Sequence, residues 1–213
     1  VGESHGMAIH ESQSLIIEMQ ACRSTSFLRY LSSRLIETFG DQPALAPDNL
    51  VRLYTHVEKG CIRVDADELT YPLHIVLRYR LEKALIRGDL ALGDLPGAWN
   101  DGMRELLGIT PPDDGQGCLQ DIHWPVGAFG YFPNYTLGAL LAAQLFQAAE
   151  RALPGLMAAI ETGNFTPLRN WLREQVHARA SSMAMRPLVE AATGAPLGPD
   201  AFLAHVEARY GAG

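Results

Sequence analysis

Apolar residues recur at three- and four-residue spacing along most of this sequence, and this pattern constrains the fold more than any other feature. Between Met7 and Gly40, for example, apolar side chains return about once per helical turn, as on the buried face of an amphipathic helix. The chain shows no strong alternation of apolar and polar residues of the kind that marks a half-buried strand. No repeat period and no Pro/Ser-rich linker divides it. The sequence therefore predicts an all-α fold, in a single multi-helix domain over residues 1–213.

Caps and breakers place the ends of the expected helices. A break is expected at 23–26, because Ser and Thr favour caps over helix interiors. Asp48 is expected to cap a helix that runs to about Lys59. The acidic stretch 65–68 resembles a capping box that opens a long helix ending at about Arg87. Further helices are expected at 92–107, interrupted or restarted at Pro96, and at 134–153, 158–162, 167–178, 185–192 and 200–210, with irregular segments at 109–117 and 124–133.

Composition excludes several classes of function. The net charge of −7 provides no basic excess to neutralise nucleic-acid phosphates. The longest apolar run, 137–149, is too short to span a membrane and is interrupted by glutamines, and the amino terminus does not resemble a signal peptide. Three widely spaced cysteines without a CxxC pattern favour reduced thiols in a cytoplasmic protein. The first residue is Val rather than Met, so we expect a processed product or a fragment.

The segment His10-Glu11-Ser12-Gln13-Ser14 begins like the zinc-binding pattern HExxH but does not complete it. Ser14 stands where the second histidine is needed, and a serine cannot replace an imidazole ligand. A helical glutamate can still supply one oxygen to a metal, oriented by a neighbouring His or Gln. Taken alone, however, the segment fits an ordinary polar helix face better than a metal site.

Two further segments concentrate polar residues. In 62–67, Arg63 precedes a long helix, and its planar guanidinium can pair with both oxygens of a substrate carboxylate. The alternative is a surface ion pair. The segment 117–135 combines Gln, Asp, His, Trp and two Tyr on a glycine-rich stretch, as in the lining of a binding site. In it, Asp121 precedes His123 by two residues and can orient the imidazole, although such a pair can also be purely structural.

Other catalytic patterns are missing from the sequence. There is no GxSxG elbow for a serine hydrolase, no P-loop and no GxGxxG dinucleotide fingerprint. The remaining histidines are isolated and are interpreted as surface or packed residues: His5, His56, His74, His177 and His205.

Taken together, the three polar segments resemble the carboxypeptidase Taq family of zinc metallocarboxypeptidases. The characteristic pieces of that family include HExxH, HES(G/Q), IRxxAD and GxxQDxHW. The last three occur here in order, at 10–13, 62–67 and 117–124. The match extends through 129–133 and 192–197, and so covers essentially the whole chain.

The resemblance implies an all-helical zinc enzyme that removes single residues from peptide C-termini and forms homodimers. Zinc, for which Co²⁺ can substitute, would be held by two His and one Glu. Glu11 would be that third metal ligand, and His10 a neighbour shaping the site. The residues implied in substrate binding are Arg63, for the terminal carboxylate, and Gln120, His123 and one of Tyr131 or Tyr135, for the pocket.

The departure from the family pattern is large. HExxH and an earlier DxRxT motif do not occur in this chain, and with HExxH go two of the three metal ligands and the general-base glutamate. No catalytic residue is therefore assigned here. We expect the C-terminal part of a larger helical metallopeptidase, with little or no activity alone. The alternative is a non-catalytic helical module for peptide binding or dimerisation, derived from the same family.

Overall fold

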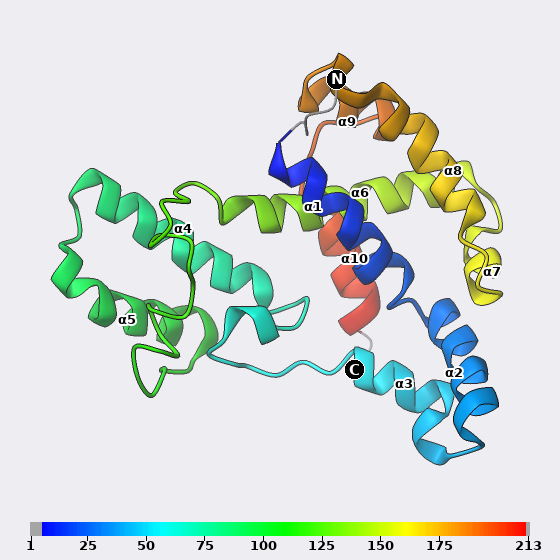
Figure 1. Cartoon of the computed structure of the whole chain (residues 1–213), viewed down its shortest axis with the longest axis horizontal. Helices are drawn as coiled ribbons and strands as arrows, with labels where there is room; N and C mark the ends of the chain where they lie inside the picture. Colours follow the sequence, from blue (N-terminus) through cyan, green and yellow to red (C-terminus); the bar gives the residue numbers. More distant parts are fainter. Residues whose placement is uncertain (1–5, 212–213) are drawn as a thin grey trace. The chain divides into compact units, whose positions relative to one another are not determined.

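The computed structural model of the chain describes residues 6–211, and these residues form helices, turns and irregular segments but no strand (Figure 1). The predicted all-α class is confirmed. The chain divides into two compact units, one made of residues 1–56 and 137–213 and the other of residues 57–136. The single domain expected from the sequence stays a prediction. Within the described part of the chain, no helix has the length and apolarity that crossing a bilayer requires.

The larger unit begins with α1 (Met7–Leu15), which continues as a π-helical turn over Ile16–Ala21. The predicted break follows at once. Ser24 caps α2 (Thr25–Phe39), because its side chain accepts a hydrogen bond from the N–H of Phe27. A short 3₁₀ turn (Pro43–Leu45) then leads into α3 (Pro47–Tyr54).

The helix predicted to start at Asp48 and end near Lys59 is about five residues shorter at its C-terminal end. Pro47 occupies the first turn of α3 and Ala46 the cap, so Asp48 lies inside the helix. Beyond Tyr54 the backbone finds other partners: the N–H of Glu58 donates to Asp67 Oδ2 at 3.0 Å. A side chain nine residues away thus replaces the helical acceptor.

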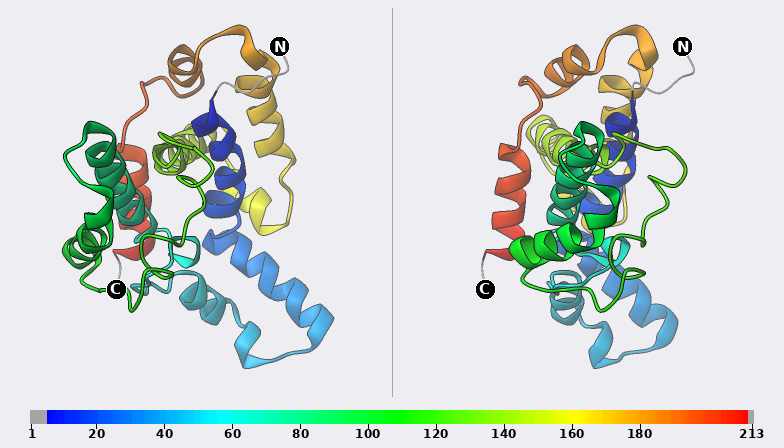
Figure 2. Two further views of the ribbon diagram at one scale, coloured as in Figure 1. Left: turned by 60° about the vertical axis from the view of Figure 1, so that its left-hand side comes forward. Right: turned by 90° about the vertical axis from the view of Figure 1, so that its left-hand side faces the viewer.

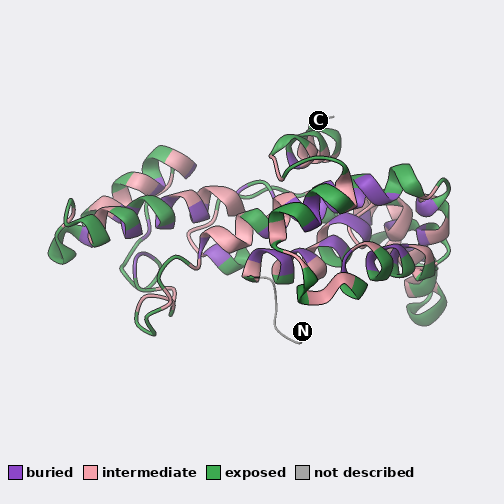
Figure 3. Cartoon of the chain, turned by 90° about the horizontal axis from the view of Figure 1, so that it is seen from above, coloured by how far each residue is buried: buried purple, intermediate pink, exposed green. Residues whose placement is uncertain are grey.

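The core of the larger unit surrounds α6 (Pro133–Ala152), whose first four residues belong to the smaller unit. Apolar residues of α1, of α7 (Leu156–Glu161), of α8 (Thr166–Gln175) and of α9 (Met185–Thr193) pack with those of α6. A 3₁₀ segment (His177–Ser182) joins α8 to α9. Most helices bury one face and expose the other, as amphipathic helices do (Figure 3).

The α1 helix crosses α6 very closely (Figures 1 and 2). A Cβ atom placed on Gly138 would lie 2.7 Å from the Cβ of Glu11 and 3.4 Å from the carbonyl oxygen of Ala8. Only a residue without a side chain allows this approach, and it fixes the backbone of the helix that carries Glu11.

The C-terminal helix α10 (Asp200–Tyr210) matches its predicted range, and the segment before it is held by Gln144 of α6. The amide nitrogen of Gln144 lies within donating distance of Thr193 Oγ1, at 2.9 Å, and of the carbonyl oxygens of Ala195 and Pro196, at 3.1 Å. Gln144 is itself buried. This glutamine thus satisfies the backbone of the link between α9 and α10.

The smaller unit contains α4 (Tyr71–Arg87) and α5 (Leu95–Leu107), followed by a long irregular segment over 108–132. The two helices approach closely at Gly102, where an added Cβ would lie 2.3 Å from a methyl carbon of Leu77. Pro96 does not interrupt a helix, because it occupies the first turn of α5 and a separate 3₁₀ turn covers Leu92–Asp94.

The start of α4 lies later than the sequence predicts. Asp65 belongs to a 3₁₀ turn (Arg63–Asp65), and the carboxylate that binds the backbone is that of Asp67, which accepts from the N–H groups of Leu69 and Thr70. The helix then begins at Tyr71, with Pro72 in its first turn. The extra turn brings Arg63 back beside the helix.

Candidate functional site

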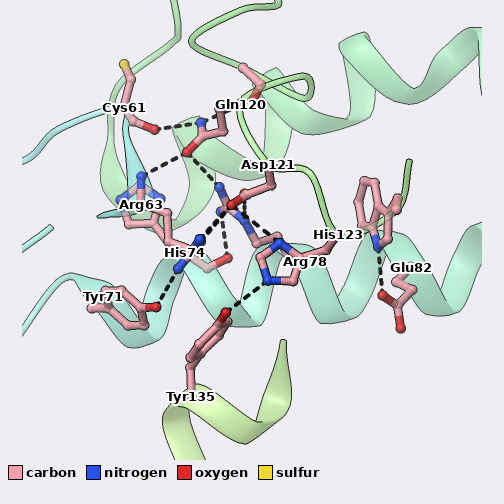
Figure 4. Close-up of polar contacts among 12 residues, drawn as sticks. Cys61, Arg63, Tyr71, His74, Arg78, Glu82, Gln120, Asp121, His123 and Tyr135 are labelled. Atoms are coloured by element: carbon pink, nitrogen blue, oxygen red, sulfur yellow. Dashed lines mark hydrogen bonds and ion pairs between the residues drawn. The ribbon is translucent and has the colours of Figure 1, made fainter. Parts of the chain in front are cut away.

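Two buried arginines share one carboxylate at the centre of the smaller unit (Figure 4). Arg63 donates from Nε and Nη2 to Oδ1 of Asp121, at 2.9 and 2.7 Å. Arg78 donates from Nε to Oδ2 of the same residue at 2.6 Å. Arg63 is 6% exposed and Arg78 is fully buried. This contact joins the IRxxAD segment, α4 and the GxxQDxHW segment at a single side chain.

Gln120 makes a second junction beside the first. Its side-chain oxygen accepts from the backbone N–H of Arg63 and from Nη2 of Arg78, both at 2.8 Å. Its amide nitrogen lies within donating distance of the carbonyl oxygens of Cys61, Gln116 and Gly117. Every polar atom of this side chain is therefore used inside the protein, which makes Gln120 a residue that orders the segment.

The network carries one positive charge in excess, since two guanidinium groups face one carboxylate. Burial alone would raise the pKa of Asp121, but the hydrogen bond from Arg63 and the charges of Arg78 and Arg63 hold it below its usual value. Burial lowers the pKa of Arg78 to about 10, although Asp121 opposes the change. All three groups are thus charged at neutral pH.

Aromatic rings enclose this charge. The guanidinium carbon of Arg63 lies 5.0 Å from the ring centre of Tyr135 and 5.6 Å from that of Tyr71, whose hydroxyl accepts from Nη1. The guanidinium of Arg78 lies 4.6 Å from the Trp99 ring. Such cation–π contacts favour a charge that has been removed from water.

His123 belongs to the same aromatic cluster. Its Nε2 lies 2.9 Å from the hydroxyl of Tyr135, and its ring lies 4.3 Å from that of Phe132 and 5.5 Å from that of Tyr131. Burial lowers the pKa of His123; Arg63 and Arg78 lower it further, and Asp121 opposes them. The imidazole is therefore neutral at neutral pH.

The structure does not show Asp121 orienting His123, which is one of the two interpretations that the sequence leaves open. Oδ1 of Asp121 lies 3.8 Å from Nδ1 of His123, which is beyond hydrogen-bond distance. Asp121 binds the arginines instead, and the hydroxyl of Tyr135 is the group that contacts the imidazole.

Glu11 and His10 lie on α1, in the larger unit. Glu11 is partly exposed and His10 is exposed. Their neighbours are tightly held: Ser12 is buried and donates to the carbonyl of Ile9 at 2.7 Å. The amide nitrogen of Gln13 donates to Ser12 Oγ at 2.9 Å, and its oxygen lies 2.8 Å from Nε2 of His177. The polar helix thus presents Glu11 from a fixed backbone.

The described residues do not complete a metal site by themselves. Over residues 6–211, no group of three or more His, Cys, Asp or Glu side chains is close enough to hold an ion. His5 lies outside the described residues. Glu11 fits the role of one oxygen ligand on a helix, and the other ligands of a zinc site would have to come from elsewhere.

The structure brings together five of the sequence-predicted residues and adds others. Arg63, Gln120, His123, Tyr131 and Tyr135 all lie in the smaller unit, in contact with one another or with shared partners. Sequence reasoning missed Arg78, Tyr71 and Glu82 of α4. For Arg78 and Glu82, the four-residue spacing with His74 was the available signal, because the three residues share one helix face.

Comparison with known proteins first defines the class. Residues 1–210 match the family described as carboxypeptidase Taq (M32) metallopeptidase. The chain belongs to this family of metallopeptidases.

Individual relatives are similar over nearly the whole chain. The sequence is 42% identical to thermostable carboxypeptidase 1 of Thermus thermophilus and 39% identical to carboxypeptidase 1 of Bacillus subtilis, in each case over 99% of this chain. The solved structure of Trypanosoma cruzi metallocarboxypeptidase 1 is similar with a TM-score of 0.94 and 41% identity over 97% of this chain. The Pyrococcus furiosus carboxypeptidase has the same TM-score with 35% identity over 99%.

The chain spans only about two fifths of the relatives' own lengths. It covers 41% of the Thermus protein, 42% of the Bacillus protein and 44% of the Trypanosoma cruzi chain. This share agrees with the family pieces that the sequence contains and with those that it lacks.

Proposed function

We propose that this chain is the C-terminal portion of a zinc metallocarboxypeptidase that releases single residues from peptide C-termini. The observation that carries the proposal is the positively charged, aromatic-lined network at Arg63, Arg78 and Asp121, which joins the 62–67 and 117–124 segments to α4. An exopeptidase needs a fixed cation to recognise the terminal carboxylate and so to hold the scissile bond in register. A buried network with an excess positive charge can serve as such a fixed cation.

Arg63 is proposed to bind that carboxylate. In the structure, two of its N–H groups bind Asp121 and a third binds Tyr71. This leaves two N–H groups on the Nη atoms of its five donors. Asp121 fixes the plane of the Arg63 guanidinium and also binds Arg78. A bound carboxylate would therefore neutralise the excess charge without disturbing the hydrogen bonds between Arg63 and Asp121.

Gln120, His123 and the tyrosines are proposed to shape the pocket around the substrate. The hydroxyl of Tyr135 contacts His123, and Tyr131 packs against both rings. A neutral imidazole can hydrogen-bond a peptide group as donor or acceptor, whereas the aromatic rings offer apolar surface to a side chain.

Glu11 is proposed to be the metal ligand that this chain contributes, with His10 beside it. When bound, zinc would polarise the scissile carbonyl and acidify a water molecule. The remaining ligands and the general base would come from an HExxH segment outside this chain. From the same family relation we propose zinc, replaceable by Co²⁺, peptide substrates with a free C-terminus, a homodimeric assembly and a cytoplasmic location.

The decisive experiment compares this chain alone with a longer protein in which an HExxH segment precedes it. Zinc is measured by elemental mass spectrometry after dialysis, and release of the C-terminal residue from an N-blocked peptide by chromatography. We expect almost no zinc and no release by the chain alone, and about one zinc per chain with release by the longer protein. In the longer protein, Glu11→Gln abolishes both, whereas Glu18→Gln, at an exposed ion pair with Arg23, changes neither.

Three outcomes contradict the proposal. Tight binding of one zinc by the chain alone would mean that other residues complete the site. If the longer protein binds zinc but releases nothing, or if no HExxH segment belongs with this chain, the second candidate applies. That candidate is a non-catalytic helical module for peptide binding or dimerisation, which the missing HExxH favours.

A further inference from the structure

Glu82 is a buried carboxylate of α4 that binds neither arginine of the network in the structure. It is 6% exposed and lies one helical turn beyond Arg78 (Figure 4). Its two oxygens accept from two different places on the segment that follows His123. The indole Nε1–H of Trp124 donates to Oε2 at 2.7 Å, and the backbone N–H of Gly130 donates to Oε1 at 2.6 Å.

These two donors stand at the two ends of the irregular stretch 124–130. Inside the stretch, backbone hydrogen bonds are local: Gly127 donates to Trp124, and Ala128 to His123. Val126 and Phe129 expose their apolar side chains, so the interior of the stretch has little packing of its own. Hydrogen bonds to Glu82 therefore tie both ends of it to the rigid helix.

Each tied residue is the sequence neighbour of a ring in the aromatic cluster. His123 precedes Trp124, and Tyr131 follows Gly130. Trp124 also packs edge-on against Trp99 and Phe132, at ring distances of 6.4 and 5.9 Å. Movement of either end of the stretch would consequently move His123 or Tyr131.

We propose that Glu82 is a positioning residue of the candidate substrate pocket: it holds both ends of the 124–130 stretch on α4 and thereby fixes the rings of His123 and Tyr131. The pocket's role in binding peptide rests on the function proposed above, whereas the positioning of the rings does not.

A carboxylate is required because both of its oxygens accept. A glutamine of the same shape has one accepting oxygen and one NH₂ group, so one of the two N–H donors would face another donor. Glu82→Gln therefore removes one hydrogen bond and the negative charge while keeping the volume. Glu82→Asp keeps the charge and both oxygens but shortens the reach.

The charge provides an independent readout at His123. The charged groups that act on this imidazole are Asp121 and Glu82, which raise its pKa, and Arg63 and Arg78, which lower it, all in addition to burial. Loss of the Glu82 charge should lower the pKa of His123 further.

The test uses isotope-labelled chain and nuclear magnetic resonance, with Glu105→Gln as the matched control. Glu105 lies on α5 and forms an exposed ion pair with Arg80. In Glu82→Gln we expect the Gly130 amide to exchange at least about tenfold faster than in the control, the Trp124 indole signal to shift, and the pKa of His123 to fall. In Glu82→Asp, the pKa of His123 should stay close to that of the unmodified chain. Unchanged Gly130 exchange and His123 titration in Glu82→Gln would overturn the proposal.

Kinetics of the longer, HExxH-containing protein then test the pocket. Glu82→Gln should raise KM for the peptide more than it lowers kcat, and Glu105→Gln should change neither. Equal kinetics for the two variants would remove the link to substrate. If the unmodified longer protein cleaves no peptide, the proposed function fails, but Gly130 exchange and His123 titration still decide the role of Glu82.

Discussion

Replacing Asp121 by Asn is the sharpest test of how the smaller unit is stabilised. In this variant Arg63 and Arg78 keep their positive charges but lose the shared negative one. The Asp121 side chain is only 10% exposed, and those of Arg63 and Arg78 are 7% and 0% exposed. Breaking a buried ion pair by removing one partner costs about 3–5 kcal/mol, because the remaining charge is left buried and uncompensated.

The lower end of that range applies here. Asn keeps one oxygen that can accept from either arginine, and the Tyr135 and Trp99 rings still face the guanidinium groups. We therefore expect Asp121→Asn to reduce the free energy of unfolding by about 3 kcal/mol. Asp101→Asn is the control: its pair with Arg104 is exposed, with side chains 77% and 58% accessible, and should contribute less than about 1 kcal/mol.

The assay is urea-induced unfolding of the two variants, followed by tryptophan fluorescence and circular dichroism. The pKa of Asp121 is lowered in the folded protein, so its contribution is complete above the unfolded-state pKa of about 3.9 and is lost as the pH falls through the folded-state pKa. The difference between the unmodified chain and Asp121→Asn should therefore shrink in acid. A loss at neutral pH no larger than that of Asp101→Asn would refute the reasoning.

Two further predictions follow from contacts described above. Gly138→Ala should destabilise the larger unit by about 1–3 kcal/mol through overpacking, since the added Cβ would lie 2.7 Å from that of Glu11. The assay is urea unfolding, with Gly97→Ala as the control because open space surrounds Gly97. Equal effects of the two substitutions on stability would contradict the close crossing of α1 and α6. His74 is fully buried, and burial, Arg78 and Arg63 lower its pKa to about 4. As the pH falls through about 6.5, His74 then binds a proton in the unfolded state but not in the folded state. The free energy of unfolding should accordingly fall as the pH drops from 6.5 towards 4, and its dependence on pH should be weaker in His74→Gln. The same pH dependence in both proteins over that range would show that His74 does not titrate this way.

The helical pattern and the break at Ser24 were readable from the sequence because they depend on neighbours within a turn or two. Ser24 breaks the first helical stretch as predicted, since the acceptor and the N–H of Phe27 are three residues apart. Where a distant group intervenes, local reasoning fails. From the sequence alone, Asp65 and Asp67 are equally suited to cap the helix. In the structure Asp67 accepts from the backbone there, and it also accepts from the N–H of Glu58.

The residues of the candidate site could be recognised in the sequence, but their interaction partners could not. Arg63 and the 117–135 segment were recognised as unusual because of their density of polar residues. The partner of Arg63 lies 58 positions away, and nothing in a single sequence reports such a pairing. Closeness in sequence made Asp121 a possible partner of His123, whereas in the fold the guanidinium groups bind this carboxylate with full charges and direct hydrogen bonds.

One face of α4 explains why the sequence did not reveal these contacts and how the site segment is held in place. His74, Arg78 and Glu82 recur every four residues, and by default a stripe of titratable side chains is assigned to solvent. Here the stripe is buried, beside Leu77 and Leu81, and the site segment lies against it: Arg78 binds Gln120 and Asp121, and Glu82 binds Trp124 and Gly130. The local backbone hydrogen bonds of this irregular segment leave the Asp121 charge, the Trp124 indole and the Gly130 N–H to be paired elsewhere, and α4 supplies the matching polar partners. The polar stripe of α4 is therefore part of the candidate site, and variants along it should disturb the 117–130 segment before they disturb the helix.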